Sequence, residues 1–243
     1  MKSLYKPVIL KKQINDEHYY WVDGVFMPGV TRILQEAMPT PYALRYWIGE
    51  VGNEKAADKL KRSGEHGTLV HETCGRLLRG ESVNLVEEFP DPADKKILVG
   101  FVNWFADVNP EIDPQFIEFT VASQLRYAGT MDLFCKIGDV PYIIDFKTSG
   151  AVYDSHRLQL VAYQNAFEEM TGIHAEMGIL HLNSKLKKGY IFNTGLEIGG
   201  KPVEISDFMT VFEVYKMLNG GKVPEPGEID VYPERLSLKR EEV

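Results

Sequence analysis

The sequence predicts an α/β fold in which a mixed β-sheet is flanked by helices and preceded by a helical N-terminal part. Three segments near the middle of the chain, at residues 116–123, 131–137 and 141–147, alternate in polarity as antiparallel strands do. A helical pattern at 154–170 follows them, and two further strand-like runs come after it. A chain that combines strands and helices in this way folds into packed α/β layers.

Composition limits the class of protein. A chain of 243 residues can bury a substantial core as one domain, and its 44% hydrophobic and 26% charged residues are typical of a globular protein. No run approaches the roughly 20 apolar residues of a membrane span, and the first residues lack the apolar core of a secretion signal. We therefore expect a cytoplasmic protein with no membrane contact. Cys74 and Cys135 are too few for a disulfide framework or for the four thiolates of an iron–sulfur cluster.

The net charge of −8 argues against a broad nucleic-acid-binding surface, because phosphate binding usually requires an excess of Lys and Arg. The charge still permits an enzyme with a local basic groove beside an acidic metal site.

The N-terminal segment carries strand signals. Residues 7–13, 18–22 and 25–27 are expected to form strands, with a turn at Asp23-Gly24. The aromatic residues at 19–21 could stack on bases, although packing on the core is the more common use of such a strand.

Helical patterns occupy most of the chain between these strands and the central ones. Thr31 is expected to cap a short helix that ends near Met38, and Ser63-Gly64 is expected to break another. The polar segment 81–94 contains two prolines and is expected to be a loop. The tail after Asn219 is rich in proline and charge and is expected to be peripheral. Further helices are predicted at residues 42–48, 53–62, 67–79, 95–108 and 205–218, and strands at 174–182 and 187–192.

A hairpin in the middle of the chain places two carboxylates together. Gly138 and Asp139 between two apolar runs predict a two-residue turn, which sets Ile137 opposite Val140. Counting back along both strands sets Asp132 directly opposite Asp145. Their Cβ atoms would lie roughly 5 Å apart, where like charges repel.

Something must therefore offset the repulsion. One carboxylate could stay protonated, a cationic side chain could lie between them, or a divalent metal could bind both. Lys147 shares the face of Asp145 and Asp132, so a solvated face with a salt bridge is the simpler alternative. Ile143 and Phe134 on the same face favour a half-buried site instead.

A predicted helix from Gly67 to Arg79, closed by Gly80, could supply another ligand. Its residues 67, 71, 74, 75 and 78 form one stripe of small residues around His71. Such a helix can pack closely on a sheet and direct His71 at it. A buried structural histidine is the alternative, but a site with two carboxylates needs further ligands, and imidazole suits several divalent metals.

Three more candidate residues lie before and after the hairpin in the sequence. Gln159 and Tyr163 are four residues apart and share a face of the helix at 154–170. Glu118 could support the site from the preceding strand or could face solvent, and the pattern leaves both roles open.

These pieces together resemble the PD-(D/E)XK nuclease superfamily, specifically its RecB-like exonuclease branch and the stand-alone phage-type exonucleases. Four motifs in order carry the resemblance, over about two-fifths of the chain. They are Gly67-xxx-His71, Gly129-Thr-Met-Asp132, Asp145-Phe-Lys147-Thr148 and Gln159-Leu-Val-Ala-Tyr163.

The resemblance implies a restriction-endonuclease-like core and a DNA exonuclease that depends on one or two Mg²⁺ or Mn²⁺ ions. It implies that His71, Asp132, Asp145 and the carbonyl of Phe146 ligate metal, and that Lys147 positions or deprotonates the attacking water. Gln159 and Tyr163 would hold the DNA backbone and brace the site. Cluster-binding members of the branch carry four cysteines, so no iron–sulfur cluster is expected here.

The expected partner is DNA, bound at an end or as a single strand, in recombination, repair or phage replication. A single-strand annealing or recombination protein is a further expected partner, and the protein could be a homo-oligomer. One nuclease domain is expected, with strands and helices at 1–64, the catalytic core at 65–195, and a helix and tail at 196–243. The alternatives are a nuclease-fold DNA-binding module without turnover and a metal hydrolase of small phosphorylated substrates.

Overall fold

A five-stranded mixed sheet forms the centre of the computed structural model, which describes residues 4–14 and 17–220. The strands lie in the order β4-β5-β6-β7-β8; β7 is parallel to β6, and the other neighbours are antiparallel. Helix α6 connects β6 to β7, as a parallel pair requires a crossover. The predicted α/β class and mixed sheet are confirmed. The strands are β4 (Glu111–Ser123), β5 (Tyr127–Ile137), β6 (Val140–Lys147), β7 (Glu176–Leu182) and β8 (Tyr190–Asn193).

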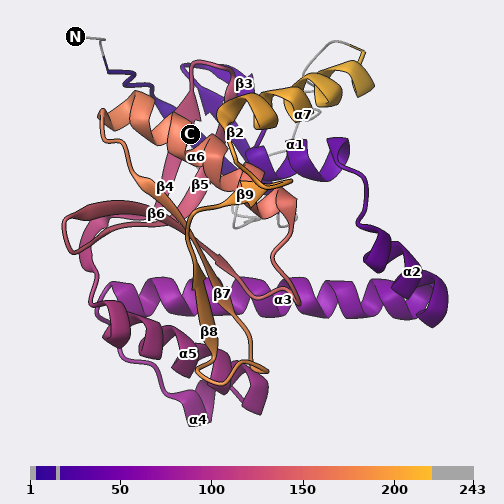
Figure 1. The fold of residues 1–243 in the computed structure, drawn as a ribbon, viewed down its shortest axis with the longest axis vertical. Helices are drawn as coiled ribbons and strands as arrows, with labels where there is room; N and C mark the ends of the chain where they lie inside the picture. Colours follow the sequence, from indigo (N-terminus) through magenta and orange to yellow (C-terminus); the bar gives the residue numbers. More distant parts are fainter. Residues whose placement is uncertain (1–3, 15–16, 221–243) are drawn as a thin grey trace, which may run out of the picture.

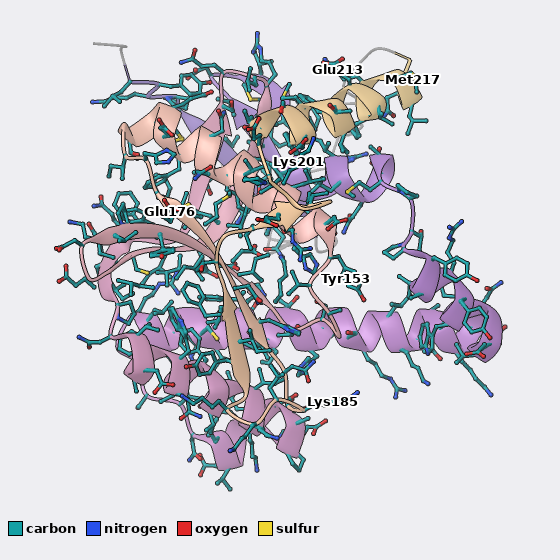
Figure 2. All side chains as sticks on the ribbon, viewed as in Figure 1. Tyr153, Glu176, Lys185, Lys201, Glu213 and Met217 are labelled. Atoms are coloured by element: carbon teal, nitrogen blue, oxygen red, sulfur yellow. The ribbon has the colours of Figure 1, made fainter. Side chains whose placement is uncertain are left out.

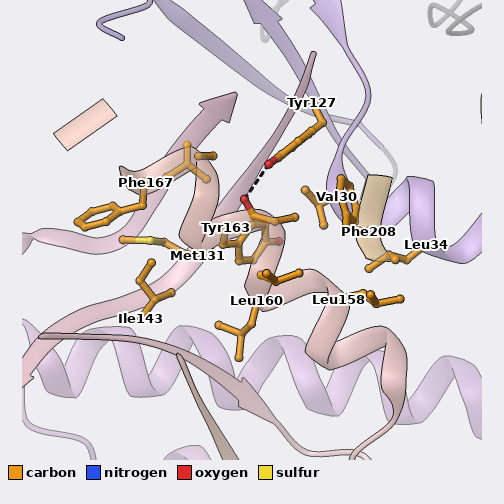
Figure 3. Close-up of a cluster of buried hydrophobic side chains, with 14 of the residues drawn as sticks. Val30, Leu34, Tyr127, Met131, Ile143, Leu158, Leu160, Tyr163, Phe167 and Phe208 are labelled. Atoms are coloured by element: carbon orange, nitrogen blue, oxygen red, sulfur yellow. Dashed lines mark hydrogen bonds between the residues drawn. The ribbon is translucent and has the colours of Figure 1, made fainter. Parts of the chain in front are cut away.

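Helices cover both faces of this sheet (Figure 1). On one side lie α1 (Val30–Ala37), α6 (Asp154–Thr171) and α7 (Ile205–Leu218), and on the other lie α3 (Asn53–Leu78) and α5 (Pro92–Val108). Each side has its own buried cluster, and Figure 3 shows the cluster around α6. The sheet is therefore the middle layer of three.

Smaller elements complete the fold. The N-terminal strands form a separate sheet of β1 (Ile9–Ile14), β2 (Glu17–Val22) and β3 (Val25–Met27), as predicted. Tyr20 on β2 is buried against this sheet and the start of β5, so its ring packs in the core. Helix α2 (Tyr42–Val51) precedes α3, and β9 (Glu197–Ile198) and β10 (Lys201–Pro202) form a short hairpin.

Helix α3 corrects one prediction. It continues without interruption through Ser63 and Gly64, where a break was expected, and spans 26 residues. One exposed glycine costs a helix only about 1 kcal/mol relative to alanine, which is too little to end a helix that packs at both ends. The α3 backbone carbonyl of Gly64 also accepts a hydrogen bond from the Thr68 hydroxyl at 3.2 Å.

Two other predictions at helix ends are wrong. Gly29, and not Thr31, is the N-cap residue of α1, because the helix begins two residues earlier than the threonine signal suggests. The expected loop at 81–94 contains α4 (Leu85–Glu88), and α5 already begins at Pro92, where Asp91 caps it. The peripheral tail predicted after Asn219 lies outside the described residues from 221 onward. Within the described part of the chain, no helix is both long enough and apolar enough to cross a membrane.

Candidate active site between the sheet and helices α3 and α6

The register of the β5–β6 hairpin follows the prediction. Ile137 pairs with Val140 and Leu133 pairs with Ile144, as the turn at Gly138 requires. The ladder ends there, one residue before Asp132 and Asp145 would face each other. The two carboxylates therefore lie where β5 and β6 begin to separate.

Strands β4 and β5 change face at this level. Met131 packs in the α6 cluster, whereas Leu133, two residues later, packs in the α3 cluster, although residues two apart on a regular strand share a face. On β4, Phe119 and Ile117 divide between the clusters in the same way. Glu118 between them has φ +54°, a left-handed conformation that residues other than glycine rarely adopt. The change of face turns Asp132 away from the side that the hairpin pattern predicts.

Asp132 points toward α3, which corrects the expectation that it shares a face with Asp145. Its Oδ1 accepts a hydrogen bond from Nδ1 of His71 at 3.0 Å, and its Oδ2 accepts one from the Phe146 backbone N–H at 2.7 Å. Burial alone would raise the pKa of Asp132. The charge and hydrogen bond of His71, the charge of Lys147 and the Phe146 N–H together lower that pKa below its usual value.

His71 reaches Asp132 because α3 lies close to the sheet. A Cβ on Gly67, one turn earlier, would contact Oγ1 of Thr148 at 3.3 Å, so the small residue permits this approach. The His71 ring also meets the Phe146 ring edge-on, at 5.9 Å between centroids. Burial lowers the pKa of His71. The charge and the hydrogen bond of Asp132 raise that pKa by a larger amount, so it lies above its usual value.

Asp145 lies on the opposite side, toward α6, and is 3% exposed. The Nζ of Lys147 lies 2.7 Å from its Oδ2, and the two form an ion pair. Apart from Lys147, no hydrogen-bond donor among the described residues reaches this buried Oδ2. Burial is the main reason that the pKa of Asp145 rises to about 6, opposed by Lys147 and assisted by the Asp132 charge.

Lys147 is held by a chain of side chains from α6 and α1. Its Nζ donates a hydrogen bond to Oε1 of Gln159 at 2.8 Å. The Gln159 amide donates in turn to the Tyr163 hydroxyl at 2.9 Å and to the Thr31 hydroxyl at 3.2 Å. The ring of Tyr163 packs against Gly129, where a Cβ would lie 3.2 Å from Cζ and closer to Cε1. Gln159 and Tyr163 therefore fix the position of Lys147 through hydrogen bonds, and Gly129 leaves the space that the Tyr163 ring occupies.

The structure thus brings seven predicted site residues into one region, from β5, β6, α3 and α6. They are His71, Asp132, Asp145, Phe146, Lys147, Gln159 and Tyr163. Glu118 lies outside this network. Its side chain is 44% exposed and pairs with Arg79 at 2.6 Å, so it takes the solvent-facing role of the two left open.

Three further residues beside the candidate site were not predicted from the sequence. Thr31 belongs to a distant helix, and no motif links it to Gln159. His181 on β7 pairs with Lys147 in the sheet, and its Nε2–H donates to the Ser149 carbonyl at 2.7 Å. His156 in the first turn of α6 accepts the Tyr153 backbone N–H on Nδ1. Burial, followed by the charges of Lys147 and Arg157, lowers the pKa of His156 to about 3.

The donor set suits a hard divalent cation, but the donors are not assembled around one. Among the described residues, no three His, Cys, Asp or Glu side chains are grouped closely enough to hold a metal ion. The carboxylates of Asp132 and Asp145 instead contact the His71 imidazole and the Lys147 ammonium. The buried Oδ2 of Asp145, which contacts the Lys147 ammonium and receives no other hydrogen bond from the described residues, is the atom best suited to accept a cation in place of that ammonium. Side-chain rotation at Asp132 and displacement of Lys147 would be needed to complete such a site.

Neither a protein-family model nor a curated protein matches this sequence. Among solved structures, the chain is similar to a protein from Eubacterium rectale named as a candidate exonuclease. The sequence identity is 14%, the match covers 71% of this chain and 77% of the other, and the TM-score is 0.39. A similarity at this level does not bear on function, so the functional argument depends on the site itself.

Proposed function

We propose that this protein is a metal-dependent nuclease that hydrolyses DNA phosphodiester bonds, acting as an exonuclease with Mg²⁺ or Mn²⁺. The observation that carries the proposal is the buried carboxylate of Asp145, whose Oδ2 pairs with the Lys147 ammonium and receives no other hydrogen bond from the described residues, near Asp132. The Lys147 ammonium is the cation that faces this buried oxygen, and a divalent ion that took its place would leave the lysine free to act at an anionic substrate.

Each residue has a role that its contacts support. Asp132, Asp145, His71 and the Phe146 carbonyl would hold the cation, which would neutralise phosphate charge and acidify water when bound. Lys147 would orient or deprotonate the attacking water, and Gln159 holds its Nζ in place. Tyr163 braces Gln159 from the core side, because its buried hydroxyl oxygen accepts a hydrogen bond from the Gln159 amide at 2.9 Å.

End-labelled single- and double-stranded DNA, incubated with Mn²⁺, Mg²⁺ or EDTA, tests the proposal. Asp145→Ala and Lys147→Ala are each expected to abolish cleavage, and only Asp145→Ala should also weaken metal binding. Asp139→Ala and Lys136→Ala are matched controls, since both residues are exposed on the same hairpin, and both variants should cleave as the wild type does.

The outcomes separate the alternatives. DNA binding without cleavage under any metal condition would favour a binding module with a nuclease fold. Hydrolysis of a small phosphodiester such as bis(p-nitrophenyl) phosphate, with no action on DNA, would favour a hydrolase of small substrates. Wild-type activity in Asp145→Ala or Lys147→Ala would overturn the assignment of the site. A role in recombination, repair or phage replication, with an annealing protein or further copies of this chain as partners, extends this proposal.

A further inference from the structure

Helix α2 exposes aromatic rings that the core does not use. No residue of α2 is fully buried, and Tyr42 and Tyr46 are 75% and 59% exposed. These two rings stack on each other, with centroids 6.4 Å apart and planes at 28°. Large exposed aromatic side chains on one short helix mark an interaction surface more often than a packing surface.

A cationic pocket adjoins these rings. Nζ of Lys59 on α3 lies 5.7 Å from the centre of the Trp47 ring, a cation–π contact. Trp47 and Lys59 line a cavity of about 460 Å³, a size within the range of ligand sites. Its other lining residues are Ala43, Leu44, Leu60, Ser63, Gly150 and Tyr153.

The pocket borders the chain segment that follows Lys147. Gly150 and Tyr153 belong to the connection that follows Lys147 at the end of β6, and Figure 2 shows Tyr153 on this connection, above α3. On α3, Leu60 and Ser63 lie on the same stripe as Gly67 and His71, because these positions repeat every three or four residues. One face of α3 therefore runs from the pocket to the imidazole that binds Asp132.

Cations line one side of that face. Lys55, Lys59 and Arg62 are spaced four and three residues apart, so they share a stripe on the exposed surface of α3. Glu54 and Asp58 flank this stripe, and Glu65 lies three residues after Arg62, where its carboxylate is 3.9 Å from Lys61. Within the described chain, neither Lys59 nor Arg62 forms a salt bridge. A net charge of −8 thus coexists with a local excess of cations, since residues 53–63 hold four basic and two acidic side chains.

We infer that α2 and the first half of α3 form a binding surface for single-stranded DNA, which delivers the strand to the site of the proposed nuclease. Bases would stack on Tyr42, Tyr46 and Trp47, while the cationic stripe contacts phosphates. Stacking selects a single strand, because a duplex buries the faces of its bases. The inference that the bound DNA enters the active site rests on the proposed function, whereas the inference of a DNA-binding surface does not.

The test uses the full chain in EDTA, so that binding is measured without cleavage. Fluorescence anisotropy of a labelled oligothymidylate of about 20 nucleotides gives the affinity, and circular dichroism confirms folding of each variant. Tyr42→Ala combined with Tyr46→Ala should weaken binding on the order of tenfold or more, since each stacked base contributes that much. Lys59→Ala should weaken binding and reduce its dependence on salt concentration.

Lys12 and Trp21 provide the matched control. Lys12 lies over the Trp21 ring at 5.2 Å, the same type of contact, but on the N-terminal sheet away from α2 (Figure 1). Lys12→Ala and Trp21→Ala should therefore leave the affinity unchanged. Equal losses from the Lys12 and Lys59 variants would overturn the inference, because the effect would then be one of general charge.

The remaining outcomes are decisive for one proposal or the other. Absence of oligothymidylate binding by the wild type, equal affinity for a blunt duplex, or unchanged binding by the tyrosine variant would each overturn the surface, even if DNA is cleaved. Binding that depends on Tyr42 and Tyr46 in a protein that never cleaves DNA would support the surface and refute the nuclease.

Discussion

Adding one methyl group at Gly129 should reduce both the stability of the protein and its cleavage activity. Gly129→Ala places a Cβ 3.3 Å from Cδ1 of Tyr163, 3.2 Å from Cζ and closer still to Cε1. The Tyr163 ring is buried among the residues of the α6 cluster shown in Figure 3. It cannot move away without displacing that core.

The cost can be worked from these contacts. Forcing an extra methyl group into a packed core costs about 1–3 kcal/mol. Displacing the Tyr163 hydroxyl also removes the hydrogen bond that the Gln159 amide donates to it at 2.9 Å, which contributes about 1 kcal/mol to stability. Replacing a strand glycine by alanine returns about 0.5–1 kcal/mol of chain entropy. We therefore expect a net loss of about 2 kcal/mol in the free energy of unfolding.

The assay is urea denaturation followed by circular dichroism, combined with DNA cleavage at a temperature where the variant remains folded. Cleavage by Gly129→Ala should fall on the order of tenfold, because Gln159 no longer fixes Lys147. Gly178→Ala is the control. Its Cβ would lie 2.6 Å from Cζ of Phe192, a comparable clash on β7 and β8 that touches no site residue. This variant should lose stability and keep its activity.

Two results would refute the reasoning. An unfolding free energy for Gly129→Ala within about 0.5 kcal/mol of the wild type would show that Tyr163 has room to move. Equal activity losses in Gly129→Ala and Gly178→Ala would show that the effect on cleavage is one of general stability and not of the hydrogen-bond chain.

Three further predictions concern single residues. His71→Ala should weaken Mn²⁺ binding at least tenfold by calorimetry; an unchanged titration would make His71 a core histidine only. His156 has a pKa lowered to about 3, so its contribution to stability is present above the unfolded value of 6.5 and is lost as pH falls toward 3. Between pH 7.5 and 5.5 in EDTA the wild type should lose about 1 kcal/mol more than His156→Gln, and equal losses would disprove this. Glu118→Gly should change stability by less than about 1 kcal/mol, whereas Glu118→Val should cost about 2 kcal/mol at φ +54°. Both Glu118 variants lose the Arg79 pair, so denaturation curves that coincide would show that the backbone is not strained there.

Local chemistry made much of the fold predictable. The turn at Gly138 and the period of two fix the β5–β6 register, and the predicted pairing of Ile137 with Val140 is the one observed. Helix α7 has the predicted bounds of Ile205–Leu218, because its apolar spacing is regular and its flanks are polar. Signals that lie within a few residues of one another were sufficient in these cases.

The wrong predictions occur where the structure depends on contacts between distant parts of the chain, or on a backbone conformation that no residue type in the sequence indicates. Glu118 adopts φ +54° with no glycine or asparagine to announce it, so the change of face on β4 and β5 could not be predicted. Thr31 meets Gln159 across 128 residues of sequence, a contact set only by the packing of α1 on α6. Helix α3 passes Gly64 because its length and packing outweigh a local preference.

The change of face also accounts for the electrostatics of the site. On a regular hairpin Asp132 and Asp145 would face each other and share one source of positive charge. The observed backbone turns Asp132 to His71 on the α3 side and leaves Asp145 with Lys147 on the α6 side, so each carboxylate has its own basic partner. A divalent ion that binds both carboxylates must compete with both partners. Binding should therefore weaken as pH falls and His71 becomes fully charged, because its pKa is raised by the same Asp132 that the ion requires.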